Sequence, residues 1–141
     1  MIYLDTSVLV AYYVPEPLSD IAQERLLAAS AVMVSELAQI EFFSALALRQ
    51  RLGHLSLSDA QRVATLFAGH LAQGLYISLH LSSAVYQQAQ MYIRRFDLAV
   101  KAPDALHLAT AAFAQAPLVT ADRQLARNAE LLDIPCELLS P

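Results

Sequence analysis

Four acidic residues could form one metal site if the fold brings them together: Asp5, Glu41, Asp104 and Asp122. Carboxylates that converge repel one another, so a cluster of four needs a cation. Hard divalent ions with oxygen ligands, Mg²⁺ or Mn²⁺, suit such a cluster. A site of this type generates a hydroxide nucleophile and neutralises a phosphate, which is the chemistry of phosphodiester hydrolysis.

Each of the three aspartates also has a simpler interpretation, because each stands where a helix is predicted to begin. Aspartate is among the preferred N-cap residues. Asp5 follows a short apolar run, residues 1–4, and Asp122 follows another, residues 117–120. The carboxyl ends of parallel strands lie along one edge of a sheet, so these two acids are expected at the same edge. No such rule places Asp104.

Glu41 is the most informative acid, because it is predicted inside a helix, residues 36–51. Helical spacing puts it on one face with three apolar residues: Leu37, Ala45 and Leu48. An ionised carboxylate on a buried apolar stripe is costly unless it is paired or binds a metal. A structural salt bridge between Glu41 and an arginine is the alternative to a metal site.

Short apolar runs and helical segments alternate between these acids. Strands are predicted at about residues 1–4, 31–34, 75–79, 117–120 and 135–138. Helices are predicted at about residues 8–13, 18–29, 36–51, 58–73, 83–94, 103–114 and 122–131, the fourth starting at a capping box that opens with Ser58. This alternation predicts an α/β fold whose parallel sheet is covered on both faces.

Composition indicates one domain, residues 1–141, with a large core. Hydrophobic residues make up 57% of the chain and charged residues 16%, against about 45–50% and about 25% in an average globular chain. Such a chain buries much apolar surface or hides some of it against a partner. We therefore expect a homodimer.

Three observations limit the compartment and the class of partner. Residues 63–93 carry no charged side chain but too many polar ones for a membrane span, and the N-terminus lacks a basic leader. A single cysteine, Cys136, excludes an internal disulfide and a cysteine-based zinc site, and fits a reducing cytoplasm. The net charge of −4 argues against a general nucleic-acid coat, though not against an enzyme with a local basic patch.

Four stretches around the acids resemble the motifs of the PIN-domain nucleases. They are LDTSVL (residues 4–9), SELAQIEFFSAL (35–46), PDALHLATA (103–111) and LVTADRQL (118–125). Within that family, the chain's size and motif spacing are similar to those of the VapC-type toxins of bacterial toxin–antitoxin pairs. The resemblance extends over residues 2–138.

This resemblance implies a three-layer α/β/α PIN-like fold with a parallel sheet of four or five strands. It implies a ribonuclease that acts on RNA with Mg²⁺ or Mn²⁺ held by Asp5, Glu41, Asp104 and Asp122, supported by the hydroxyls of Thr6, Ser7 and Thr120. It also implies a cognate antitoxin that blocks the site. Arg123, next to the last acid, is the best candidate to bind a substrate phosphate.

Two other functions fit the sequence less well. A receiver-type phosphoacceptor needs an early acidic pair and a late lysine, but Asp5 has no acidic neighbour and Lys101 is the only lysine. A PIN-like module that binds a partner without cutting RNA would suit the apolar composition, but the presence of all four acids argues against it. His107, three residues after Asp104, is interpreted as a packed, hydrogen-bonded histidine.

Overall fold

Twelve segments of regular structure make up the chain, and the computed structural model describes all of residues 1–141. The strands are β1 (Ile2–Leu4), β2 (Val32–Ser35), β3 (Ile77–Leu79), β4 (Leu118–Thr120) and β5 (Cys136–Leu138). The helices are α1 (Thr6–Tyr13), α2 (Ser19–Ala28), α3 (Glu36–Arg51), α4 (Leu57–Ala72), α5 (Ser83–Ile93), α6 (Ala102–Ala114) and α7 (Arg123–Leu131).

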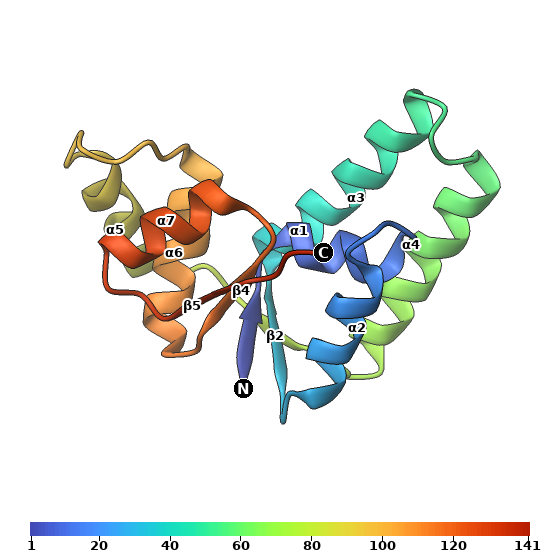
Figure 1. Ribbon diagram of the computed structural model, residues 1–141, viewed down its shortest axis with the longest axis horizontal. Helices are drawn as coiled ribbons and strands as arrows, with labels where there is room; N and C mark the ends of the chain where they lie inside the picture. Colours follow the sequence, from blue (N-terminus) through green and yellow to red (C-terminus); the bar gives the residue numbers. More distant parts are fainter.

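The sheet lies between two groups of helices, α1 to α4 on one side and α5 to α7 on the other (Figure 1). All five strands run parallel, in the order β3-β2-β1-β4-β5. The predicted α/β fold with three layers is therefore confirmed. The fifth strand, expected at an edge, pairs only with β4.

Strand β1 is central, and the strand order reverses beside it. Tyr3 pairs with Met33 of β2 on one side and with Leu118 of β4 on the other. The chain adds β2 and β3 on one side of β1, then returns to add β4 and β5 on the other side. Open α/β sheets bind ligands at the carboxyl ends of their strands where the order reverses. Asp5 follows β1 directly, and Thr120 ends β4, so both stand at this point.

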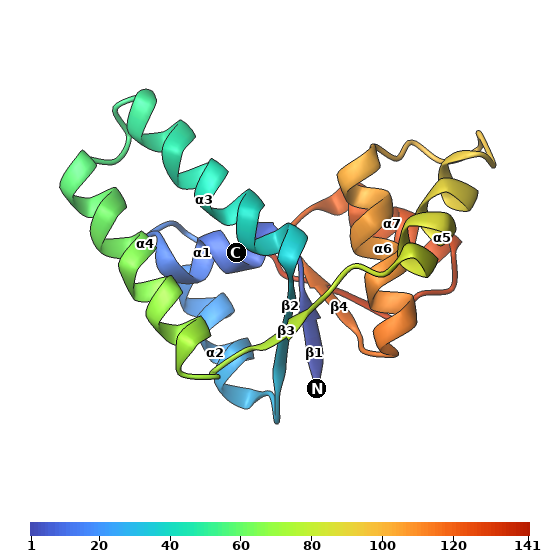
Figure 2. The ribbon, with the colours of Figure 1, turned by 180° about the vertical axis from the view of Figure 1, so that it is seen from behind.

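Alternate residues of the central strands pack into two separate cores, because successive side chains of a strand point to opposite faces. Ile2 and Leu4 belong to the core that contains Phe42 of α3. Tyr3 belongs to the core that contains Leu108 of α6 and Leu125 of α7, in the opposite helix group. The two helix groups seen from behind in Figure 2 are thus held by opposite faces of the same short strands.

Several helices begin at a side chain that accepts a hydrogen bond from the helix backbone. These N-caps are Asp5, Ser35, Ser56, Ser82 and Asp122. The predicted start of the fourth helix at Ser58 is wrong: α4 begins at Leu57, and the Ser56 hydroxyl accepts from the Asp59 N–H at 3.0 Å. The pattern of serine followed by a polar residue three positions later occurs at both serines, and only the earlier one has the extended backbone of a cap.

A further group of buried residues joins α5 to α6, outside the two main cores. It contains Val85 and Ala89 of α5 and Ala105 and Ala109 of α6. None of the helices combines the length and the apolar character that crossing a bilayer requires.

Candidate active site

Asp5 is a buried carboxylate at the end of the central strand. It is 4% exposed. The Ser7 hydroxyl donates to Oδ1 and the Thr120 hydroxyl to Oδ2, both at 2.6 Å, and the Val8 N–H also donates to Oδ1. Burial raises the pKa of Asp5, and the hydrogen bonds from Ser7 and Thr120 act against that rise. The two hydroxyls therefore favour the charged form of a carboxylate that burial disfavours.

Asp122 is joined to Asp5 through the residues between β4 and α7. The Asp122 N–H donates to the Thr120 hydroxyl at 3.0 Å, and that hydroxyl donates in turn to Asp5. The Ala121 N–H donates to the Ser7 hydroxyl at 2.9 Å. Asp122 caps α7 as expected, but both helix N–H groups, those of Gln124 and Leu125, donate to its Oδ1. One oxygen of Asp122 thus does the capping, and Oδ2 is left for another partner.

Glu41 lies beside the buried stripe of α3 and not on it, which corrects the prediction. The buried residues of α3 are Ala38, Phe42 and Leu46. The face predicted to be buried is only partly covered, since Leu48 is 47% exposed and the Glu41 side chain 31% exposed. Helical spacing shows which residues share a face, but it does not show which apolar face packs on the sheet when both are apolar.

The predicted alternative for Glu41, a salt bridge with an arginine, is also wrong. Its Oε1 accepts from the Thr6 hydroxyl at 2.8 Å and pairs with His107 Nε2 at 2.6 Å. Burial by itself would raise the pKa of Glu41, but the hydrogen bond and charge of His107, together with the Thr6 hydroxyl, outweigh it and lower the pKa. Glu41 is therefore held ionised, and both bonds leave its Oε2 free.

Asp104 does not cap its helix, contrary to the simpler interpretation. The N-cap of α6 is Lys101, and Asp104 lies in the first helical turn, one turn before His107. Burial raises its pKa, and so do the negative charges of Asp122, Glu41 and Asp5, in that order, while His107 lowers it. All three other acids are thus close enough to repel Asp104. This is the clearest sign that the four carboxylates share one neighbourhood.

The donor atoms suit a hard divalent cation, although the carboxylates do not yet enclose one. Oxygens of Glu41 and Asp122 are left over by the protein's own hydrogen bonds, and the mutual repulsion at Asp104 would be relieved by positive charge. As the side chains lie, no three acidic, histidine or cysteine residues form a group that could hold a metal ion. Binding a cation would therefore require these oxygens to move together.

A cavity of about 360 Å³ opens beside the acids. Thr6, Ser7 and Ala121, which are close in sequence to Asp5 and Asp122, line one part, and Arg49 of α3 and Glu16 line another. Sequence reasoning missed Arg49 as a neighbour of the site. The signal was present, because Arg49 follows Glu41 by eight residues and so falls on the same side of α3.

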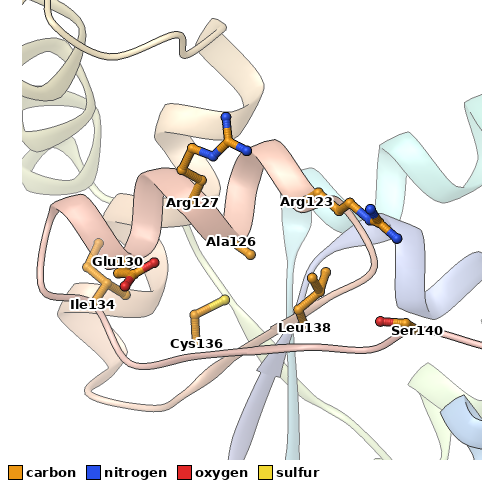
Figure 3. Close-up of a pocket in the computed structure, with 8 residues that line it drawn as sticks. All are labelled: Arg123, Ala126, Arg127, Glu130, Ile134, Cys136, Leu138 and Ser140. Atoms are coloured by element: carbon orange, nitrogen blue, oxygen red, sulfur yellow. The ribbon is translucent and has the colours of Figure 1, made fainter.

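Arg123 lines a different cavity, of about 590 Å³, between α7 and β5. Figure 3 shows it at the start of α7, with Arg127 one turn further along and Cys136 and Leu138 on the strand below. None of the four acids lines this cavity. Burial, and then the charges of Asp5 and Glu137, raise the pKa of the Cys136 thiol to about 11. The thiol is therefore protonated at neutral pH and is a poor nucleophile.

The model of the PIN domain family matches residues 2–131. Among solved structures, VapC20 of Mycobacterium tuberculosis, described as a Sarcin-Ricin loop cleaving toxin, is 20% identical; the match covers 84% of this chain and 87% of that one, with a TM-score of 0.67. FitAcB from Neisseria gonorrhoeae is 22% identical over 96% of each chain, with a TM-score of 0.69. VapBC2 from Rickettsia felis, bound to a DNA fragment from its promoter, is 19% identical over 99% of this chain and 100% of that one, with a TM-score of 0.70. Such low identities show a shared fold. No curated protein matches the chain by sequence.

Proposed function

The chain belongs to the PIN-domain family, and on that premise we propose that it is a metal-dependent endoribonuclease, the toxin of a toxin–antitoxin pair. The observation that supports this most strongly is the charge environment of Asp104. Three other carboxylates, from residues far apart in sequence, repel it in one partly buried place. A carboxyl group whose pKa is raised by burial together with specific charged neighbours is a candidate for a functional site.

In this proposal, Asp5, Glu41, Asp104 and Asp122 hold Mg²⁺ or Mn²⁺. When bound, such a cation lowers the pKa of water and neutralises charge on a phosphate. The chain's own hydroxyls have a separate task. Ser7 and Thr120 donate to the two oxygens of Asp5, and Thr6 donates to Glu41, which favours the charged form of each carboxylate.

The RNA backbone would be bound by arginines on either side of the acids. Arg123 stays the proposed phosphate contact on the α7 side, next to Asp122 in sequence. Arg49 is the cation in the cavity on the α3 side. A planar guanidinium can bind a phosphate through two parallel hydrogen bonds, which suits this role.

An antitoxin protein is the proposed partner, and a homodimer the proposed assembly, in the cytoplasm. The likeness in fold to a chain of a toxin–antitoxin complex from Klebsiella pneumoniae supports the antitoxin. Exposed apolar side chains support the existence of a protein interface: Ile40 and Leu48 of α3 and Leu57 and Leu66 of α4 are each close to half exposed or more. Such residues favour burial against another chain.

The test is RNA cleavage by purified protein, using labelled RNA with Mn²⁺ and with EDTA. We expect cleavage with Mn²⁺, none with EDTA, and a loss of at least about 100-fold in Asp5→Asn, the scale of losing one preorganised charged group. Asp20→Asn, an exposed acid of α2, is the matched control and should cleave normally. Cleavage that survives both EDTA and Asp5→Asn would refute the mechanism. An intact fold that never cleaves would favour the interaction module.

A further inference from the structure

A continuous chain of hydrogen bonds runs from the interior of the protein to Glu41. The Ser35 hydroxyl is 2.9 Å from the Tyr3 hydroxyl, which is 2.7 Å from His107 Nδ1. On the other side of the imidazole ring, Nε2 is 2.6 Å from Glu41 Oε1, and the Thr6 hydroxyl donates to the same oxygen. The chain joins β1, β2, α6, α3 and α1, elements from both sides of the sheet (Figure 1).

The inner members of this chain are shielded from water. Ser35 and Tyr3 are fully buried, and His107 is 3% exposed. Every buried side-chain nitrogen and oxygen in the molecule has a hydrogen-bond partner. A carboxylate can only accept, so Nε2 must carry the proton in the bond to Glu41. With both ring nitrogens engaged, the imidazole cannot rotate without leaving a buried polar atom unpaired, which is costly.

We propose that His107 is a positioning residue, which fixes the Glu41 carboxylate relative to Asp104 so that the pair can hold a divalent cation. This rests on the proposed function. Asp104 and His107 lie one turn apart on α6, while Glu41 lies on α3. The bond from His107 to Glu41 therefore ties the carboxylate of α3 to the helix that carries Asp104, on the other side of the sheet. Glu41 keeps Oε2 for the cation because both donors use Oε1.

A purely structural histidine would matter only for folding, whereas a positioning one must change affinity for the cation in the folded protein. Partners that orient a metal ligand typically account for about 10–100-fold in metal affinity or activity. His107→Leu keeps the bulk of the ring but has no donor, and His107→Gln keeps an N–H near the place of Nε2. We expect His107→Leu to weaken Mn²⁺ binding by about 10–100-fold and His107→Gln to restore most of it.

The experiment measures Mn²⁺ dissociation constants by electron paramagnetic resonance of the free ion, with circular dichroism to verify folding. Tyr3→Phe keeps the histidine but removes the partner of its Nδ1, so it should weaken Mn²⁺ binding less than His107→Leu does. This variant replaces His107→Leu in the test if His107→Leu does not fold. His80→Leu is the matched control, because it breaks an exposed contact with Glu36, 3.1 Å long, outside the cluster. Its affinity should equal that of the wild type.

The outcomes separate this inference from the proposed function. If the wild-type protein binds no Mn²⁺, the metal site fails and the inference is overturned with it. If the wild type binds Mn²⁺ and the folded His107→Leu protein binds it equally well, or if His107→Gln is no better than His107→Leu, the inference alone is overturned. Nitrogen-15 NMR adds a readout that needs no metal: Nε2 of His107 should be protonated, and an unprotonated Nε2 would also overturn it.

Discussion

Asp5 and Asp104 both have raised pKa values, but the fold treats their charges differently. For Asp5, burial is opposed by hydroxyl donors on both carboxylate oxygens. For Asp104, burial is reinforced by the charges of Asp122 and Glu41. The charge of Asp5 is thus partly compensated by hydrogen-bond donors. Asp104 is the acid whose charge most needs a compensating cation. Asp104 is therefore the acid at which removing the charge should relieve the most repulsion.

Replacing Asp104 by asparagine should stabilise the metal-free protein near neutral pH while abolishing RNA cleavage. A group whose pKa is raised on folding contributes stability below its unfolded pKa, and loses it as the pH rises through the folded pKa. The wild type in EDTA should therefore lose stability relative to Asp104→Asn as the pH rises from about 4 through the raised pKa of Asp104, because only the wild type acquires the repelled charge.

Urea unfolding in EDTA across that pH range measures the difference directly. Asp20→Asn, at an exposed acid outside the cluster, should show no such pH-dependent gain. The interpretation of Asp104 is contradicted if Asp104→Asn is less stable than the wild type near neutral pH without metal. In that case the first-turn position of Asp104 in α6, where a negative charge is favourable, would outweigh the repulsion.

At the scale of elements, helix starts carry the acids to the sheet edge. α1 and α7 each follow a strand directly and begin at an aspartate cap, so the same residues end a strand, start a helix and supply a carboxylate. Because one aspartate can fill both roles, the sequence alone could not distinguish a capping aspartate from a metal ligand. The structure separates them by atom at Asp122, whose Oδ1 alone caps the helix.

The N-cap of α4 can be tested by comparing substitutions at Ser56 and at Ser58. Ser56→Ala should lower the free energy of unfolding by about 0.5–2 kcal/mol, because the Asp59 N–H loses its acceptor. Ser58→Ala, a change of the same size at another exposed position, should stay within about 0.5 kcal/mol of the wild type. Chemical denaturation of both variants shows which of the two serines caps α4. A larger loss for Ser58→Ala would restore the start predicted from sequence.

At the scale of the whole molecule, the acids come from both helix groups. Asp5 and Glu41 belong to the side of α1 and α3, and Asp104 and Asp122 to the side of α6 and α7 (Figures 1 and 2). A cation shared by all four would link the two groups across the carboxyl end of the sheet. The consequence is that metal binding should stabilise the global fold and not merely one loop.

Metal removal tests this link. A ligand that binds only the folded state stabilises it by about 2.7 kcal/mol at 100 times its dissociation constant. We therefore expect the melting temperature to be higher with excess Mn²⁺ than with EDTA, in calorimetry. Asp5→Asn should lose most of that difference. The shared site is disproved if Mn²⁺ leaves the wild type unchanged, or if Asp5→Asn gains as much as the wild type.

Local pattern in the sequence determined most of the elements, and together with the family motifs it indicated the four candidate acids. Apolar runs, helical spacing and caps are features of neighbouring residues, which is why α3 was predicted at its observed bounds and Asp122 at the start of α7. The one boundary error of consequence, Ser58 for Ser56, arose where two local patterns overlapped.

Only the tertiary structure decided how these elements meet. That β1 lies between β2 and β4 depends on which strands pair, and nothing within a strand records its neighbour. Likewise, the partner of Glu41 is a histidine 66 residues away, and their side chains meet although α3 and α6 lie on opposite sides of the sheet. Side-chain types and spacing are properties of the chain, but distances between carboxylates, and hence their charge states, arise from packing. The acids were therefore readable in the sequence, and their surroundings were not.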